Sequence, residues 1–62
     1  MNLYKITNKS TGEERYYKSK TKAAHACHSN TVRFELALLT KPFKNYDIEY
    51  ADFNVPVDQV EF

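Results

Sequence analysis

The sequence predicts a small α+β domain: a three-stranded antiparallel sheet, built from a β-hairpin and a closing strand, with two short helices on one face. A turn at Ser10-Thr11-Gly12 separates two strand-like stretches and indicates the hairpin. Two helix-like stretches follow, and the polar break His28-Ser29-Asn30 between them has the spacing of a helix-turn-helix. The alternating segment Tyr46-Asp47-Ile48-Glu49-Tyr50 then predicts the closing strand.

The hairpin is predicted from alternation and from turn chemistry. Residues 3–8 place Tyr4 and Ile6 on one face of a strand. The glycine of the turn can adopt the positive φ that such turns require. The return strand, predicted over residues 14–18, contains Tyr16-Tyr17, and aromatic residues favour β geometry.

The ends of both helices carry recognisable signals. Ser19 offers an N-cap oxygen for a first helix that continues through Cys27. Either Asn30 or Thr31 can cap a second helix over residues 32–39. Pro42 is predicted to end that helix, because proline disfavours α geometry in the residue before it.

The two predicted helices differ in the size and polarity of their side chains. The first helix is thin, because three of its residues are alanines (Ala23, Ala24 and Ala26). The second has an i, i+4, i+7 apolar stripe made by Val32, Leu36 and Leu39. Phe34 and Leu38 add a second apolar row, so little of this helix remains polar.

The pattern weakens after residue 50, which predicts a module over residues 1–50 and an acidic C-terminal tail over residues 51–62. Residues 52–57 alternate but include Pro56, which confines them to a sheet edge or a loop.

The charge of the chain changes from basic to acidic toward the C-terminus. Residues 1–44 carry nine basic and three acidic groups, whereas residues 45–62 carry five acidic groups and no basic one, so that +6 and −5 give the net +1. This asymmetry indicates a basic binding face with an acidic appendage, or ordinary solvated charge.

Composition excludes several classes of protein. A chain of 62 residues forms one domain at most, and nine aromatic residues argue against disorder. No apolar run approaches the roughly 20 residues that cross a bilayer, and residues 1–5 lack the apolar region of a secretory signal, so no membrane partner is expected. The single Cys27 cannot form an internal disulfide, which favours a reducing cytoplasmic setting.

Several segments together resemble the nuclease-associated modular (NUMOD) domain, a small helix-turn-helix module appended to phage and intron-encoded homing endonucleases. They are YKITNKSTGE at residues 4–13, YKS at 17–19, KAA at 22–24 and KNYDIEY at 44–50. The resemblance covers roughly residues 4–50 and implies DNA contact by the second helix, and a phage or mobile-element origin. The opening is also similar to the first strand of GIY-YIG nucleases, but the Tyr-Ile-Gly element of an active nuclease is absent.

The helix-turn-helix hypothesis assigns roles to two sets of residues. Arg33 lies near the start of the second helix, where it can contact guanine, and the polar residues Ser29, Asn30 and Thr31 can donate to phosphate. Three lysines flank the first helix and can neutralise phosphates: Lys18, Lys20 and Lys22. The alternative is that Asn30 and Thr31 only cap the helix and that the basic side chains are solvated surface charges.

No cofactor, metal site or catalytic set is predicted. His25, Cys27 and His28 contain zinc-binding groups, but Cys27 lies well round the helix from the two histidines and no fourth ligand is apparent. There is no Gly-rich phosphate loop and no Ser/His/Asp set, so the chain is not expected to be an enzyme.

Two functions remain after these exclusions. The first is a small phage-type protein that binds double-stranded DNA, as a homodimer or on tandem sites because one copy offers little contact area. The second is a phage-encoded module that binds and modulates a host protein through its apolar second helix and acidic tail. The position of Phe34 and Leu38 separates them: burial is compatible with DNA binding, and exposure favours protein docking.

Overall fold

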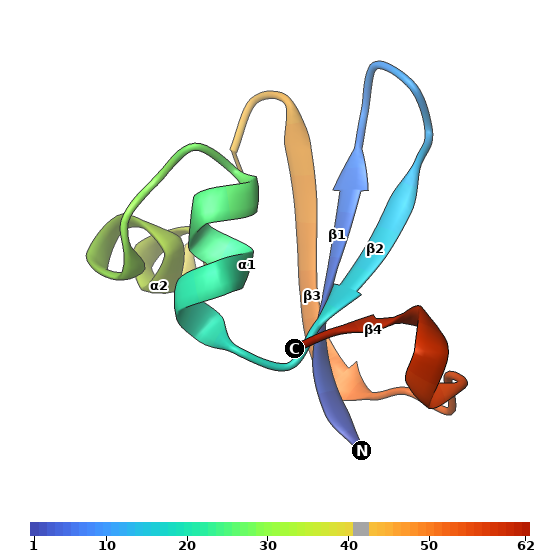
Figure 1. The fold of residues 1–62 in the computed structure, drawn as a ribbon. Helices are drawn as coiled ribbons and strands as arrows, with labels where there is room; N and C mark the ends of the chain where they lie inside the picture. The colour runs from blue at the N-terminus through green and yellow to red at the C-terminus, as the bar shows by residue number, and fades with distance from the viewer. Residues whose placement is uncertain (41–42) are drawn as a thin grey trace.

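The computed structural model describes residues 1–40 and 43–62. Its elements are β1 (Asn2–Asn8), β2 (Glu14–Tyr17), α1 (Lys20–Ala26), α2 (Thr31–Leu39), β3 (Tyr46–Asp52), a 3₁₀ turn η1 (Val57–Gln59) and β4 (Val60–Glu61). The four strands form one sheet in the order β3-β1-β2-β4. Both helices lie on one side of this sheet, and the turn η1 lies on the other side (Figure 1).

The predicted hairpin and closing strand are present. β1 pairs antiparallel with β2 on one side and with β3 on the other, so Ile6 lies between Arg15 and Ile48. The hairpin turn depends on Gly12, whose φ is +78°, and on Asn8, whose side chain accepts from the Ser10 backbone N–H at 2.8 Å. Turn chemistry and alternation therefore identified this part of the sheet correctly.

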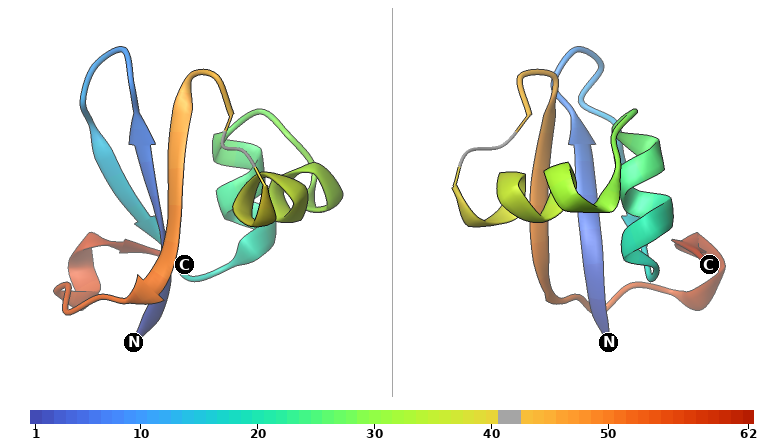
Figure 2. Two further views of the ribbon diagram at one scale, coloured as in Figure 1. Left: turned by 180° about the vertical axis from the view of Figure 1, so that it is seen from behind. Right: turned by 90° about the vertical axis from the view of Figure 1, so that its left-hand side faces the viewer.

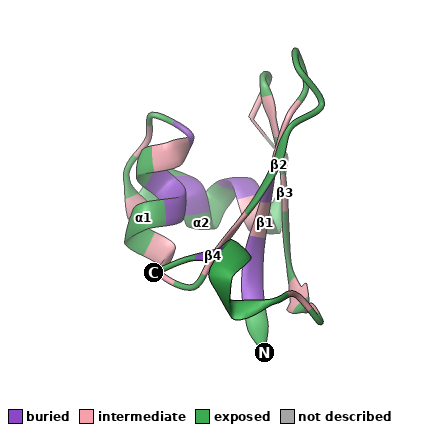
Figure 3. Cartoon of the chain, turned by 45° about the vertical axis from the view of Figure 1, so that its right-hand side comes forward, coloured by how far each residue is buried: buried purple, intermediate pink, exposed green. Residues whose placement is uncertain are grey.

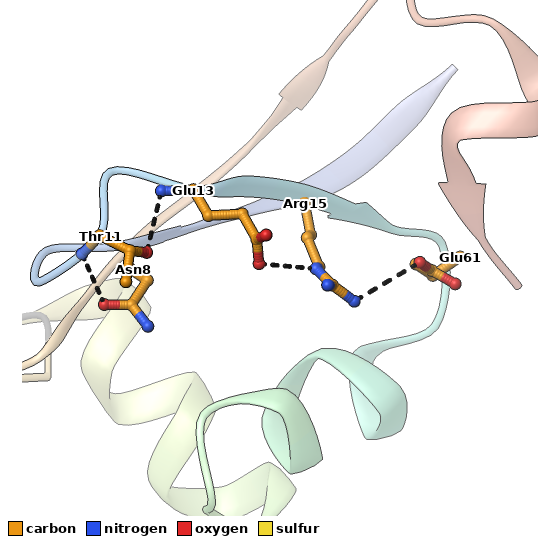
Figure 4. Close-up of polar contacts among 5 residues, drawn as sticks. All are labelled: Asn8, Thr11, Glu13, Arg15 and Glu61. Carbon is orange, nitrogen blue, oxygen red and sulfur yellow. Dashed lines mark hydrogen bonds and ion pairs between the residues drawn. The ribbon is translucent and has the colours of Figure 1, made fainter.

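The C-terminal tail supplies an element that the sequence did not predict. β4 pairs in parallel with β2, so the sheet has four strands and is mixed, where three antiparallel strands were expected. Lys18 donates its backbone N–H to the Glu61 carbonyl at 3.1 Å, and the Arg15 guanidinium lies between the carboxylates of Glu13 and Glu61 (Figure 4). The division between a module at 1–50 and a separate tail stays a prediction, but Val60 of this tail is buried.

Both helices begin at the residues that their caps predict. Ser19 precedes α1, and its hydroxyl accepts from the Lys22 backbone N–H. Asn30 precedes α2, and its side chain accepts from the Arg33 backbone N–H at 2.9 Å, which selects Asn30 over Thr31 as the cap. Pro42, which was predicted to end the second helix, lies outside the described residues.

The core lies between the sheet and the helices. Its buried cluster consists of Tyr4, Ile6, Ala23, Ala24, Cys27 and Phe34. The alanines let α1 approach the sheet closely, and the Phe34 ring packs edge-on against Tyr4 with 5.5 Å between ring centroids. Figure 2 shows α2 running across the strands rather than along them.

The i, i+4, i+7 apolar row of α2 does not face the core, as a single apolar stripe on a helix normally does. Phe34 is fully buried and Leu38 is partly buried against the core. The i, i+4, i+7 stripe is instead exposed, at 66% for Val32, 56% for Leu36 and 82% for Leu39. Figure 3 shows this alternation of buried and exposed residues along α2. Because both rows are apolar, periodicity alone could not identify the one that faces the sheet.

Candidate nucleic-acid interface

The two helices follow one another in the chain and are joined by the four residues 27–30. After α1 ends, the Ser29 backbone N–H donates to the Ala24 carbonyl at 2.9 Å, which turns the chain back. His28 adopts a left-handed conformation with φ of +56°, at a place in the turn where glycine is often found. Residues other than glycine adopt this conformation in only a few per cent of cases, so the sequence did not identify His28 as left-handed.

Arg33 occupies the first turn of α2 and is exposed. Within residues 1–40 and 43–62, no acidic group lies at ion-pair distance from its guanidinium. The side chain can therefore extend toward a ligand without breaking an internal ion pair. Contact of Arg33 with DNA stays a prediction.

The polar residues before α2 differ from one another. Asn30 is exposed, but its side-chain oxygen is used as the helix cap. The Ser29 hydroxyl is buried and has no hydrogen-bond partner among the described residues, which does not favour a phosphate contact. Thr31 is half-buried. The side chain of Asn30 caps α2, and contact of these three residues with DNA stays a prediction.

The three lysines around α1 are not equivalent. Lys18 and Lys22 are exposed. The Lys20 ammonium donates to the Glu35 carboxylate of α2, and this hydrogen bond raises the pKa of Lys20. The pair brings the start of α1 beside the middle of α2. Lys20 is thus partly neutralised, while Lys18 and Lys22 remain available to an external anion.

Charge separates between the helical segment and the rest of the chain. Residues 18–45 contain six basic residues and one acid, a balance of +5, whereas residues 46–62 contain five acids and no base. Residues 1–17 contribute three bases and two acids, so that +1, +5 and −5 give the net +1. The segment that contains both helices is therefore basic, although the net charge of the chain is only +1.

The outward row of α2 is a competing feature. Val32, Leu36 and Leu39 expose aliphatic side chains on the helix that carries Arg33. Base edges in the major groove mostly present hydrogen-bonding groups, and the thymine methyl is the main apolar feature there. This row suits an apolar partner surface better than it suits most base pairs.

The segment where α1 ends contains two histidines and a cysteine: His25, Cys27 and His28. Among the described residues, no three His, Cys, Asp or Glu side chains gather closely enough to hold a metal ion. Cys27 is buried, and burial raises the pKa of its thiol to about 11, so the thiol is protonated at neutral pH.

No helix in the described part of the chain is long and apolar enough to cross a membrane. The sequence matches no protein-family model, and no curated protein or solved structure matches it significantly. The functional assignment therefore depends on the geometry of the helix-turn-helix unit and on its charges.

Proposed function

We propose that this chain is a small helix-turn-helix protein that binds double-stranded DNA, with α2 at the major groove. The observation that carries the proposal is Arg33, which is exposed on the first turn of α2 directly after the bend and has no ion-pair partner among the described residues. Side chains at this position of a recognition helix reach base edges, and arginine can bind guanine with two hydrogen bonds.

The basic character of the helical segment supports the proposal. Lys18 and Lys22 are exposed near α1, the helix that crosses the DNA backbone in such units. Each lysine that neutralises a phosphate releases counterions, so binding weakens as salt rises. The burial of Phe34 is also compatible with DNA binding, because the largest side chain of α2 does not obstruct the groove.

A salt titration on a mixed-sequence duplex tests the proposal without knowledge of the target site. We expect the log-log slope of affinity against salt to fall by about 0.9 for each of Lys18→Ala and Lys22→Ala. Lys9→Ala is the matched control, because it removes the same charge from the hairpin turn, where Lys9 pairs with Asp47 at 3.5 Å. Absence of salt-sensitive binding to any duplex at low salt would contradict the proposal.

The setting proposed with this function is the cytoplasm of a bacterial host. One copy buries little surface on DNA, so useful affinity requires two copies or two adjacent sites. Fluorescence anisotropy at two protein concentrations, combined with sedimentation, distinguishes these stoichiometries.

A second candidate is docking on a host protein, which the exposed row Val32, Leu36 and Leu39 favours. For this function, replacing Leu36 and Leu39 by Ser abolishes capture of a stoichiometric partner from a bacterial lysate. Val57→Ser is the matched control, because Val57 is 62% exposed on η1. The same double replacement leaves the salt slope of DNA binding unchanged if α2 contacts DNA through Arg33 alone. Failure to capture any partner would exclude this candidate.

A further inference from the structure

Of the two edge strands of the described sheet, β3 is the long one, and its unpaired side is called the margin below. β3 contains seven residues, whereas the other edge strand, β4, contains two. Among the described residues, β1 is the only strand that pairs with β3. A strand of this length with an unpaired side can accept an additional strand from another chain.

The backbone hydrogen bonds between β3 and β1 show which residues of β3 direct their N–H and C=O groups away from β1. Asn45 accepts from the Lys9 backbone N–H at 3.0 Å, and Phe53 donates to the Met1 carbonyl at 3.0 Å. Groups that face one neighbour alternate along an antiparallel strand, so the odd-numbered residues of β3 face β1. Tyr46, Ile48 and Tyr50 therefore direct their N–H and C=O groups away from β1.

Side chains along β3 divide into an apolar and an acidic face. Tyr46, Ile48 and Tyr50 lie on the helix face, in register with residues of β1 that include Ile6. Asp47 and Glu49 lie on the opposite face and are exposed. Asp47 pairs with Lys9, whereas Glu49 forms no ion pair within the part of the chain that the structure describes.

Apolar side chains at this margin are only partly covered. Tyr46 and Ile48 of β3, Leu38 of α2 and Phe43 pack against the core but remain half-buried. In the right-hand view of Figure 2, α2 crosses β3 and ends beyond its unpaired side. The helix layer is therefore wider than the sheet at this margin, and an added strand would lie beneath its end.

A second copy of this chain does not suit the margin. Residues directly opposite one another on antiparallel strands share a face. Self-pairing centred on residue 48 places Asp47 against Glu49 of the other copy, and centring on residue 47 or 49 places an acid against itself. Like charges directly opposite are destabilising, so the acids disfavour self-pairing in the registers centred on residues 47, 48 and 49.

We propose that β3 accepts an extended peptide segment in which apolar and basic side chains alternate. The apolar side chains lie beneath the end of α2, beside Ile48, and the basic ones face Asp47 and Glu49. Backbone hydrogen bonds with Tyr46, Ile48 and Tyr50 extend the sheet by one strand. This site is on a different element from Arg33, so the inference does not depend on DNA binding.

The test uses the full chain labelled with ¹⁵N and a capped heptapeptide of alternating Val and Lys. We expect saturable amide shifts at residues 46–52 and at the end of α2. For a peptide that runs antiparallel to β3, the Val nitrogens face β3, and their N-methylation weakens binding at least tenfold because the methyl groups block hydrogen bonds to the edge. N-methylation of the Lys nitrogens, which face solvent, is the matched control and has a smaller effect.

Charge is tested separately. Glu49→Lys weakens peptide binding about three- to tenfold, whereas Asp58→Lys, an equal charge change at an exposed residue of η1, does not. Equal binding of both N-methylated peptides, or of a peptide with the same residues in two blocks, would overturn the proposal. Shifts confined to β4, or concentration-dependent dimerisation at residues 46–52 without peptide, would also overturn it.

Discussion

Phe34 and Leu36 lie two residues apart on α2, and we predict opposite consequences for their truncation. Phe34 has no exposed surface and contacts Tyr4 and Phe43, with ring centroids at 5.5 and 6.5 Å. Leu36 keeps 56% of its surface exposed. Phe34→Ala removes the largest fully buried side chain of the described residues, whereas Leu36→Ala removes a side chain that is mostly in water.

The expected magnitudes follow from burial. Truncation of a buried phenylalanine to alanine costs about 3–5 kcal/mol, because both transfer energy and a cavity contribute. Complete burial of a leucine contributes about 1.5–3 kcal/mol, so a leucine that is 56% exposed loses about 1 kcal/mol at most. A 62-residue domain has a free energy of unfolding of about 3–9 kcal/mol. Phe34→Ala therefore removes much of the stability of the fold, and Leu36→Ala leaves most of it.

Urea denaturation followed by circular dichroism at 222 nm measures both effects. We include Phe34→Leu, which keeps part of the side chain and gives a folded baseline if Phe34→Ala is unfolded in buffer. The reasoning requires Leu36→Ala to be the least destabilised of the three variants. A larger loss for Leu36→Ala than for Phe34→Leu would show that the exposed stripe is the core face, and would refute the orientation of α2.

Three further predictions concern the helix-turn-helix bend. Asn30→Ala removes the cap of α2 and lowers the free energy of unfolding by about 1 kcal/mol, whereas Asn30→Asp retains a capping oxygen and does not; urea denaturation measures both. His28→Gly raises the thermal midpoint, because relief of the left-handed conformation, about 1–2 kcal/mol, exceeds the added chain entropy of glycine, about 0.5–1 kcal/mol; a lowered midpoint would refute this. Burial raises the pKa of the Cys27 thiol in the native state to about 11, compared with 9.0 for an ordinary thiol. The unfolded state therefore loses this proton first, and the free energy of unfolding falls as pH rises from 9 toward 11. Cys27→Ala should flatten that fall in urea denaturation at alkaline pH.

Local signals predicted much of this fold because they depend on few residues. Gly12 and its neighbours specify the hairpin turn, and the side chains of Ser19 and Asn30 cap the two helices. Alternation identified β3, although the strand continues to Asp52, beyond the predicted Tyr50. These features require only the backbone and side chains of adjacent residues, so one sequence is sufficient to predict them.

Three features that depend on residues far apart in the sequence were not predicted, although the pairing of β3 with the hairpin was. β4 exists because Val60 and Glu61 meet Tyr16 and Tyr17 of a strand more than 40 residues earlier, and a two-residue strand has no periodicity to detect. The ion pair between Lys20 and Glu35 likewise joins two helices, and it partly neutralises one of the lysines expected to contact phosphate. For α2, the sequence supplied two apolar rows and no signal to choose between them.

The strand order carries a consequence for synthesis on the ribosome. β1 is made first but lies inside the sheet, and its partner β3 is not complete until residue 52. A two-stranded hairpin alone is only marginally stable in water. The hairpin of β1 and β2 therefore stays marginally stable while both helices are translated, until β3 pairs with β1. Nascent chains stalled before residue 46 should remain sensitive to protease, and protection should appear abruptly once β3 has left the exit tunnel.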